Sequence, residues 1–255
     1  MKAPYPFGYI GEGVTRCVVL ALPAWKVQRM LPPNLELGEQ DVLAKGAHPV
    51  VLQFHDFSHC RFSVPSLLQP LNFHEQTLGV PFTRISSRYG GSAGLGPFYF
   101  MPKLYLDDLW VWTVGRNLWG FDKEMAGVNV TKDRYTVTNS AGRRLVSVGW
   151  SGEGASAPLL GLSGFESIRR MLSQTLISLS PAGVGPFFAL TDFNRDWSHA
   201  AVRRLKAVMD VDPCYVRGFE GGRFATDAEG ADREHSIVGS YEVSAQWWLS
   251  FPYLP

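Results

Sequence analysis

The sequence has few cysteines, no long apolar run and almost no excess of charge of either sign. Its three cysteines, Cys17, Cys60 and Cys214, are odd in number and widely separated along the 255 residues. Such a set does not build a disulfide framework, so we expect free thiols in a reducing compartment. The sequence therefore predicts a cytoplasmic protein.

Segments that target or anchor a protein in a membrane are also absent. The opening stretch MKAPYPFGYIGEG has proline and glycine where a signal peptide has an apolar run, and CVVLALPAW is too short to span a bilayer. The 24 basic residues nearly balance the 23 acidic ones, and no long run of like charges occurs. This balance argues against nucleic acid or a membrane surface as a partner and favours a small molecule.

The sequence is rich in short segments of β-branched and aromatic residues separated by glycine and proline, a pattern that predicts strands. Hydrophobic residues make up 45% of the chain, enough for a large core, and the length suits one domain over residues 1–255. The segments are RCVVLAL, VVLQFHDF, PFTRISSRY, PFYFMPKLYL, LWVWTV, VNVTKDRYTV, RRLVSVGW and YEVSAQWWLSF.

Helices are fewer. PAWKVQRML begins with a proline suited to a helix start, and FESIRRMLSQTLISL, residues 165–179, has apolar residues at three- and four-residue spacing. WSHAAVRRLKAV, residues 197–208, is a weaker helix candidate. Because strands do not alternate with helices, we predict an α+β fold that is mainly antiparallel β, with a barrel-like or sandwich-like core.

Two other motifs have plainer explanations. GGSAG around Ser92 has the form of a hydrolase nucleophile turn, but a strand and not a helix follows it, so a glycine-rich turn is the better interpretation. His55, His59, Cys60, His74 and Glu75 could form a metal set. On a strand, however, His55 and His59 would lie roughly 13 Å apart, so we expect no metal site.

The segment VGRNLWGFDKEMAG contains a single lysine, Lys123, close to Trp119 and Phe121. The aromatic residues could simply be core, and the lysine could reach the surface to pair with Asp122 or Glu124. Alternatively, the apolar neighbours remove water from the amine and disfavour the ammonium form. A neutral amine is the nucleophile that Schiff-base catalysis requires.

This segment resembles the active-site segment of the acetoacetate decarboxylase family, in which a Gly-Arg pair precedes the lysine that forms the Schiff base. Here the pair is Gly115 and Arg116, and the lysine is Lys123. FHEQTLGVPF is similar to the family segment that carries an active-site glutamate, which corresponds to Glu75. TRCVVLALPAWKVQRMLPPNLEL is similar to the family's opening segment, whose arginine corresponds to Arg16. The C-terminal strand resembles the family only loosely.

The resemblance implies an antiparallel β cone or barrel with packed helices, assembled as a homo-oligomer. It also implies a lyase that acts on a small keto acid through Lys123, by decarboxylation or by a related aldol or dehydration reaction. No metal or organic cofactor is required, because the imine serves as the electron sink.

The resemblance also assigns roles to the other candidate residues. Arg16, with Arg116, would bind the substrate carboxylate, and Glu75 would orient the substrate or move protons. Arg116 could equally be a structural ion-pair partner. Gln53 stands where the family has a further glutamate, and we expect it to contact substrate. The remaining expected contacts are Trp119 and Phe121.

One position departs from the family pattern. The decarboxylases carry a second lysine directly after the first, whereas this chain has Glu124. A carboxylate facing the amine would stabilise the ammonium form, so we predict that Glu124 modulates the protonation of Lys123. The same change supports an alternative function, a non-catalytic binding protein that keeps the β cavity.

Overall fold

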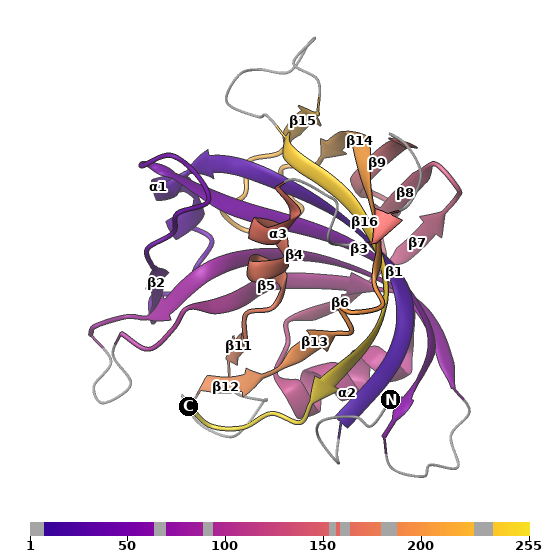
Figure 1. Cartoon of the computed structure of the whole chain (residues 1–255), viewed down its shortest axis with the longest axis horizontal. Coiled ribbons are helices and arrows are strands. Elements are labelled where there is room, and N and C mark those ends of the chain that lie inside the picture. Colours follow the sequence, from indigo (N-terminus) through magenta and orange to yellow (C-terminus); the bar gives the residue numbers. More distant parts are fainter. Residues whose placement is uncertain are drawn as a thin grey trace.

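Five long strands form the centre of one twisted, mainly antiparallel sheet. They are β1 (Gly8–Pro23), β3 (Ala47–Phe62), β4 (Leu71–Ile85), β5 (Phe98–Leu106) and β16 (Ile237–Ser250), in the spatial order β5-β4-β3-β1-β16. The computed structural model describes residues 8–63, 70–88, 94–152, 157–158, 164–179, 188–226 and 237–255. Ser92 lies outside the described residues. Figure 1 shows the long strands running side by side across the molecule.

The sheet continues beyond both ends of this central group, in the order β12-β11-β5 on one side and β16-β14-β9-β8-β7 on the other. Only β11 and β6 pair in parallel with β5 among the described strand pairs. The shorter strands are β2 (Leu35–Leu37), β6 (Lys123–Met125), β7 (Gly127–Val130), β8 (Arg134–Thr138), β9 (Arg144–Gly152), β10 (Ala157–Pro158), β11 (Leu176–Leu179), β12 (Phe188–Thr191), β13 (Phe193–Arg195), β14 (Ala201–Val211) and β15 (Gly222–Ala225).

Each face of the sheet carries its own hydrophobic cluster, because successive side chains of a strand point to opposite faces. In β1, Val18 and Leu20 belong to one cluster, whereas Cys17 and Val19 belong to the other. Helix α1 (Ala24–Gln28) packs on the Val18 face through Val27. Helices α2 (Leu109–Trp119) and α3 (Phe165–Leu172) pack on the Cys17 face. Alternate residues of each strand therefore reach opposite faces, and only one set of them can contribute to a site on a given face.

The mainly antiparallel β prediction is confirmed, but the predicted strand LWVWTV is wrong. These residues begin α2, where the Asp108 side chain accepts a hydrogen bond from the Val111 backbone N–H and Gly120 closes the helix in a left-handed conformation. The buried positions Val111, Gly115 and Trp119 lie four residues apart. This helical period outweighs the strand propensity of the β-branched and aromatic residues.

Two helix predictions are also corrected. The helix predicted for residues 165–179 ends at Leu172, and Leu176–Leu179 instead forms β11 between β5 and β12. The weaker helix candidate at residues 197–208 is largely β14, whose buried residues mostly alternate with more exposed ones from Leu205 to Val211. Pairing with β9 and β16 decides the structure of this segment.

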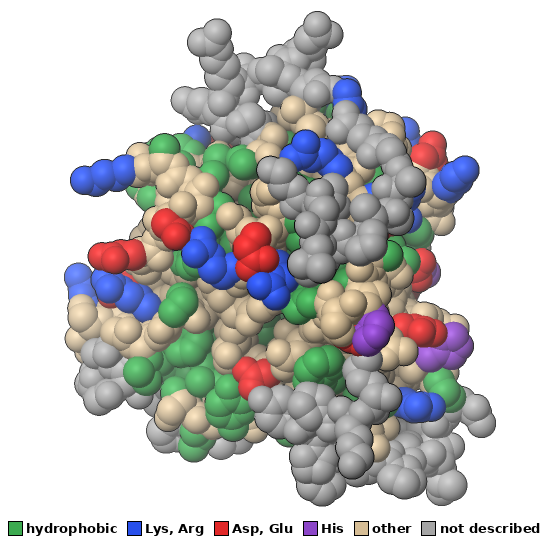
Figure 2. Space-filling view, viewed as in Figure 1, with side chains coloured by type: hydrophobic (Ala, Val, Ile, Leu, Met, Phe, Trp, Pro, Cys, Tyr) green, Lys and Arg blue, Asp and Glu red, His purple; other side chains and the backbone are tan. Residues whose placement is uncertain are grey.

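Charged side chains of both signs are mixed over the face shown in Figure 2. Ion pairs such as Arg169 with Glu166 and Arg170 with Asp41 join charges of opposite sign on the described part of the chain. The arrangement agrees with the nearly balanced net charge. Among the described helices, none is long and apolar enough to cross a membrane.

A close approach between β4 and β5 requires a residue without a side chain at Gly79. A Cβ atom at this position would overlap the ring of Tyr99, which is buried and whose hydroxyl accepts a hydrogen bond from the Gln53 amide at 2.8 Å. The absence of a side chain at Gly79 thus leaves room for the Tyr99 ring on the Cys17 face.

Replacing Gly79 with alanine is expected to lower the free energy of unfolding by about 1–3 kcal/mol, because the core must shift to admit the added methyl group. Urea denaturation measures this change. Gly222→Ala is the matched control in a strand, since no atom lies within 4 Å of a Cβ there. Equal stability of the two variants would contradict the proposed overlap with Tyr99.

Candidate active site

A mostly apolar cavity lies on the Cys17 face of the sheet, beneath α2. Its volume is about 80 Å³. Since one water needs about 10–15 Å³ on this scale, the cavity suits a ligand of roughly five to eight non-hydrogen atoms. The lining residues include Tyr9, Gln53, His55, Phe57, Phe73, Glu75, Thr77, Tyr99, Val111, Gly115, Trp119, Phe121, Lys123, Phe193, Arg195 and Trp247.

The cavity contains a buried ion pair between the two residues predicted to be catalytic. Lys123 Nζ donates a hydrogen bond to the Glu75 carboxylate at 2.6 Å, and the two side chains are 6% and 11% exposed. Lys123 opens β6 and Glu75 lies in β4, on either side of β5. A charge taken out of water is tolerated only when it is paired, and removing one partner of such a pair typically costs about 3–5 kcal/mol.

Gly115 of α2 has no side chain and so leaves room for Lys123. A Cβ atom on Gly115 would lie 2.8 Å from Lys123 Cδ and 2.9 Å from Nζ, closer than side chains normally approach. The backbone of α2 therefore packs directly on the lysine side chain. The Trp112 indole also donates a hydrogen bond to the Lys123 carbonyl at 3.1 Å, which ties the helix to β6.

Glu124 does not face the amine. It pairs with Lys103 at 3.2 Å and its side chain is 43% exposed. Consecutive residues of β6 point to opposite faces, so Lys123 enters the cavity while Glu124 points away from it. The structure brings Glu75, not Glu124, to the lysine.

The other predicted site residues divide into two groups. Gln53, Trp119 and Phe121 line the cavity, and all three are buried. The Trp119 indole donates a hydrogen bond to the Ser250 carbonyl at 2.8 Å, which fixes the ring.

The two predicted arginines lie elsewhere. Arg16 pairs with Glu242 at 2.8 Å. Because Arg16 and Cys17 are consecutive in β1, the Arg16 side chain points to the face of the sheet opposite the cavity. Arg116 is exposed on α2 and stacks over Trp112, 4.9 Å from the ring centre, because residue 116 is outside the buried stripe of the helix. The structure therefore does not bring either arginine to the cavity.

A different arginine, Arg195 at the end of β13, lines the cavity and was missed from the sequence. It is 6% exposed and donates hydrogen bonds to the Gln53 side-chain oxygen at 3.0 Å and to the Leu172 carbonyl at 3.2 Å. Burial lowers its pKa to about 10, so the guanidinium stays charged at neutral pH. Its aromatic neighbours in FNRDW were the one local signal that could have indicated it, since arginine often stacks on such rings.

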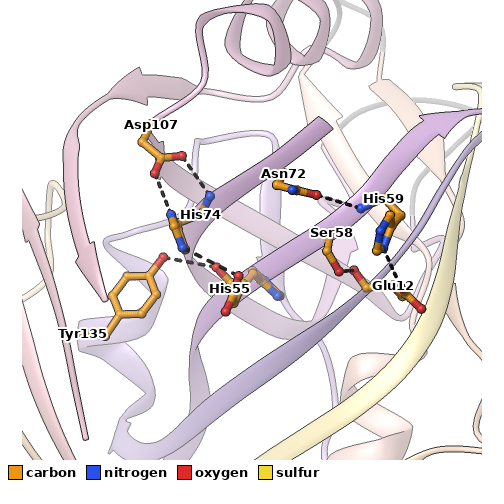
Figure 3. Close-up of polar contacts among 9 residues, drawn as sticks. Glu12, His55, Ser58, His59, Asn72, His74, Asp107 and Tyr135 are labelled. Carbon is orange, nitrogen blue, oxygen red and sulfur yellow. Dashed lines mark hydrogen bonds and ion pairs between the residues drawn. The ribbon is translucent and has the colours of Figure 1, made fainter. Parts of the chain in front are cut away.

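The histidines do not form a metal site. His55 lines the cavity, and its pKa is held well below the ordinary value, first by burial and then by the nearby cations Arg195 and Lys123. The ring is thus neutral, and it contacts Thr15 at 2.9 Å. His59 is exposed and contacts Glu12, away from His55 (Figure 3). No group of potential metal ligands occurs in the described part of the chain.

Three buried polar atoms of the lining have no hydrogen-bond partner within the described residues. They are the Tyr9 hydroxyl, the Thr77 hydroxyl and the Trp247 indole nitrogen. A buried donor without a partner typically costs about 1–3 kcal/mol. These groups are available to bind the oxygen atoms of a polar ligand.

His74, next to Glu75 in sequence, links β4 to the segment that begins α2. Its imidazole contacts the Asp107 carboxylate at 2.7 Å, and its backbone N–H also donates to Asp107 (Figure 3). The imidazole also lies 3.6 Å from the Asp56 carboxylate. Asp107 directly precedes the N-cap residue Asp108. The hydrogen bond to Asp107 raises the pKa of His74, against a smaller opposing effect of burial.

A family model described as acetoacetate decarboxylase (ADC) matches residues 10–159, more than half of the chain. This range includes Lys123 and Glu75 but ends before Arg195. Comparison with curated proteins finds no match by sequence.

Solved structures share the fold. An acetoacetate decarboxylase from Legionella pneumophila aligns with a TM-score of 0.59 and 15% identity, over 100% of this chain and 92% of the other. The enduracididine biosynthesis enzyme MppR complexed with pyruvate aligns with a TM-score of 0.58 and 15% identity, over 100% and 91%. MppR complexed with the condensation product of pyruvate and imidazole 4-carboxaldehyde aligns with a TM-score of 0.57 and 14% identity, over 99% and 90%. The predicted β fold of this type is therefore confirmed.

The His74 contacts predict a pH dependence of stability. The pKa of His74 is raised above its ordinary 6.5 in the folded protein, so the charged pair with Asp107 stabilises fully below that value. This contribution is lost as the pH rises from 6.5 through the raised folded pKa. Urea denaturation at several pH values should show the decline in the parent protein and a flatter profile in His74→Gln and Asp107→Asn. Identical profiles in all three proteins would refute the role of the pair.

Proposed function

This chain belongs to the acetoacetate decarboxylase family, and from that membership we propose that it is a lyase that forms a Schiff base between Lys123 and a small keto acid. The observation that carries the proposal is the buried Lys123 amine, which lies 2.6 Å from a carboxylate in a cavity of small-molecule size. Nucleophile and base are within direct hydrogen-bond reach, as covalent catalysis by an amine requires.

Glu75 would serve as the proton carrier. It takes a proton from the Lys123 ammonium, and the freed amine attacks the ketone carbon to form a carbinolamine. Glu75 then returns the proton to the carbinolamine hydroxyl, water leaves, and a protonated imine remains. The 2.6 Å contact allows the first transfer, from the Lys123 ammonium to Glu75, without rearrangement of the strands.

The protonated imine would act as the electron sink of the reaction. When a bond beside the imine carbon breaks, to carbon dioxide or to a proton, its electron pair enters the imine and gives a neutral enamine. The unpartnered donors Tyr9, Thr77 and Trp247 would hold the oxygen atoms of the substrate. No other electron sink is required for this chemistry.

The size of the cavity and the neighbouring structures support a small keto acid. Pyruvate is bound by MppR, and a second MppR structure holds a condensation product of pyruvate. A three- or four-carbon keto acid has roughly the number of atoms that the cavity volume allows. We further propose that residues 1–255 act as one domain within a homo-oligomer, and a native molecular mass equal to that of one chain would contradict the oligomer.

The alternative is a binding protein that keeps the cavity without catalysis. Its main support in the sequence is Glu124 in place of the family's second lysine. In the structure Glu124 pairs with Lys103 outside the cavity, so it does not oppose an imine at Lys123. The contact with Glu75 favours the enzyme over the binding protein.

Borohydride reduction in the presence of pyruvate or acetoacetate should attach the keto acid to Lys123, identified by peptide mass spectrometry. Lys123→Gln should abolish the adduct, because no amine remains in the cavity. Lys103→Gln is the control, since Lys103 lies on the outer side with Glu124. Absence of an adduct with every keto acid and neutral ketone tested would remove the enzyme proposal.

Gly115→Ala should reduce the rate of adduct formation by about 10- to 100-fold. The added methyl group would displace the lysine side chain, and overpacking of this kind costs about 1–3 kcal/mol. Asn117→Ala, at an exposed position of the same helix, should leave the rate unchanged. The trapping assay measures both variants. An unchanged rate in Gly115→Ala would show that close packing of α2 on Lys123 is not needed for imine formation.

A further inference from the structure

Arg195 is the least compensated charge in the cavity. Lys123 is neutralised by Glu75, and His55 is neutral. Among the described residues, no carboxylate forms an ion pair with Arg195, whose described hydrogen bonds go to the uncharged Gln53 and to a backbone carbonyl. The cavity therefore has an excess of one positive charge, on a side chain that is 6% exposed.

The guanidinium of Arg195 is held in a fixed orientation. Gln53 accepts its hydrogen bond at 3.0 Å and donates to the Tyr99 hydroxyl at 2.8 Å. The Phe193 ring lies 4.5 Å from the guanidinium carbon and the Trp197 ring 5.7 Å from it. Two of the five N–H donors of an arginine are used in the described hydrogen bonds, which leaves donors for a planar anion.

Arg195 and Lys123 serve the same cavity. Both line it. The positive charges of Arg195 and Lys123 both lower the pKa of His55, a residue of β3 that also lines the cavity. A ligand that forms an imine with Lys123 can therefore present a second group to Arg195. An anionic group would gain most there, because an unpaired buried charge is costly.

We propose that Arg195 binds the carboxylate of the keto acid and retains it through the reaction. The inference rests on the proposed imine at Lys123 and assigns the substrate class of that site. Arg195 takes the place of Arg16 and Arg116, which the sequence predicts as the carboxylate ligands.

The expectation that the substrate keeps its carboxylate follows from what happens to the carboxylate charge in each possible reaction. Loss of carbon dioxide removes the negative charge from the carboxylate, so an arginine that holds this charge stabilises the ground state more than the transition state. Removal of a proton beside the imine carbon leaves the carboxylate unchanged. In that step the C–H bond breaks, Glu75 takes the proton, and the electron pair forms the enamine. Arg195 thus favours an α-keto acid that keeps its carboxylate, as in aldol or dehydration chemistry.

The first test compares a keto acid with a neutral ketone in the same trapping assay. Wild-type protein should trap pyruvate faster than acetone, and Arg195→Gln should reduce this preference by about 10- to 100-fold, as expected for a charge-assisted hydrogen bond. Gln53→Glu keeps the shape of the side chain but adds a counter-charge, so it should reduce the preference as well. Arg116→Gln tests the arginine expected from the sequence and should leave the preference unchanged.

Trapping of acetone separates the possible failures. A variant that still traps acetone has an intact lysine site, so an unchanged preference in Arg195→Gln would overturn the role of Arg195 alone. If wild-type protein traps neither ketone, the proposed function itself fails. A measurement without variants guards against misfolding: isobutyrate should inhibit acetone trapping at least tenfold better than isobutyramide. Equal inhibition by the two would also overturn the proposal.

The second test concerns retention of the carboxylate. In D₂O the protein should exchange the methyl hydrogens of pyruvate for deuterium faster than it releases carbon dioxide from acetoacetate. NMR measures the exchange. Release of carbon dioxide without exchange would overturn the retention while leaving the imine at Lys123 intact. Exchange that persists unchanged in Arg195→Gln would show that another group binds the carboxylate.

Discussion

The ion pair between Lys123 and Glu75 determines how the site is built. An amine and a carboxylate that are almost fully removed from water must lie in contact, so β4, β5 and β6 have to keep one register. Helix α2 must pass close enough to exclude water, which Gly115 allows. The cavity, the aromatic lining and the position of α2 all follow from enclosing this pair.

Strand parity explains which residues reach the cavity. Gln53, His55, Glu75 and Thr77 alternate along β3 and β4 and enter the lining together. By the same alternation, Glu124 and Arg16 point to the other face, although each is adjacent in sequence to a residue of the cavity side. A resemblance in sequence can identify the segment that carries the chemistry, but the local parity of each strand decides which of its side chains takes part.

The sequence predicted most long strands correctly, because their β-branched and aromatic residues are separated by clear turn signals. It failed for LWVWTV, where propensity favoured a strand but the capping residues Asp108 and Gly120 and the spacing of Val111, Gly115 and Trp119 form a helix. Lys123 and Glu75 could be predicted as a pair only from the family resemblance. Arg195 could not be assigned to the cavity, because its aromatic neighbours indicate only stacking and its cavity partner Gln53 is 142 residues away in sequence.

The separation of these residues along the chain has a chemical consequence. The segment that matches the family model carries Lys123, Glu75 and Gln53, whereas Arg195, Phe193 and Trp247 come from the part that follows it. On the proposed mechanism, imine formation depends on the first part and recognition of the carboxylate depends on the second. Because the described hydrogen bond of Arg195 to the first part goes to the neutral side chain of Gln53, a change near β13 could alter the substrate without disturbing the Lys123 and Glu75 pair. The proposed mechanism therefore assigns imine formation and substrate selection to separable parts of the chain.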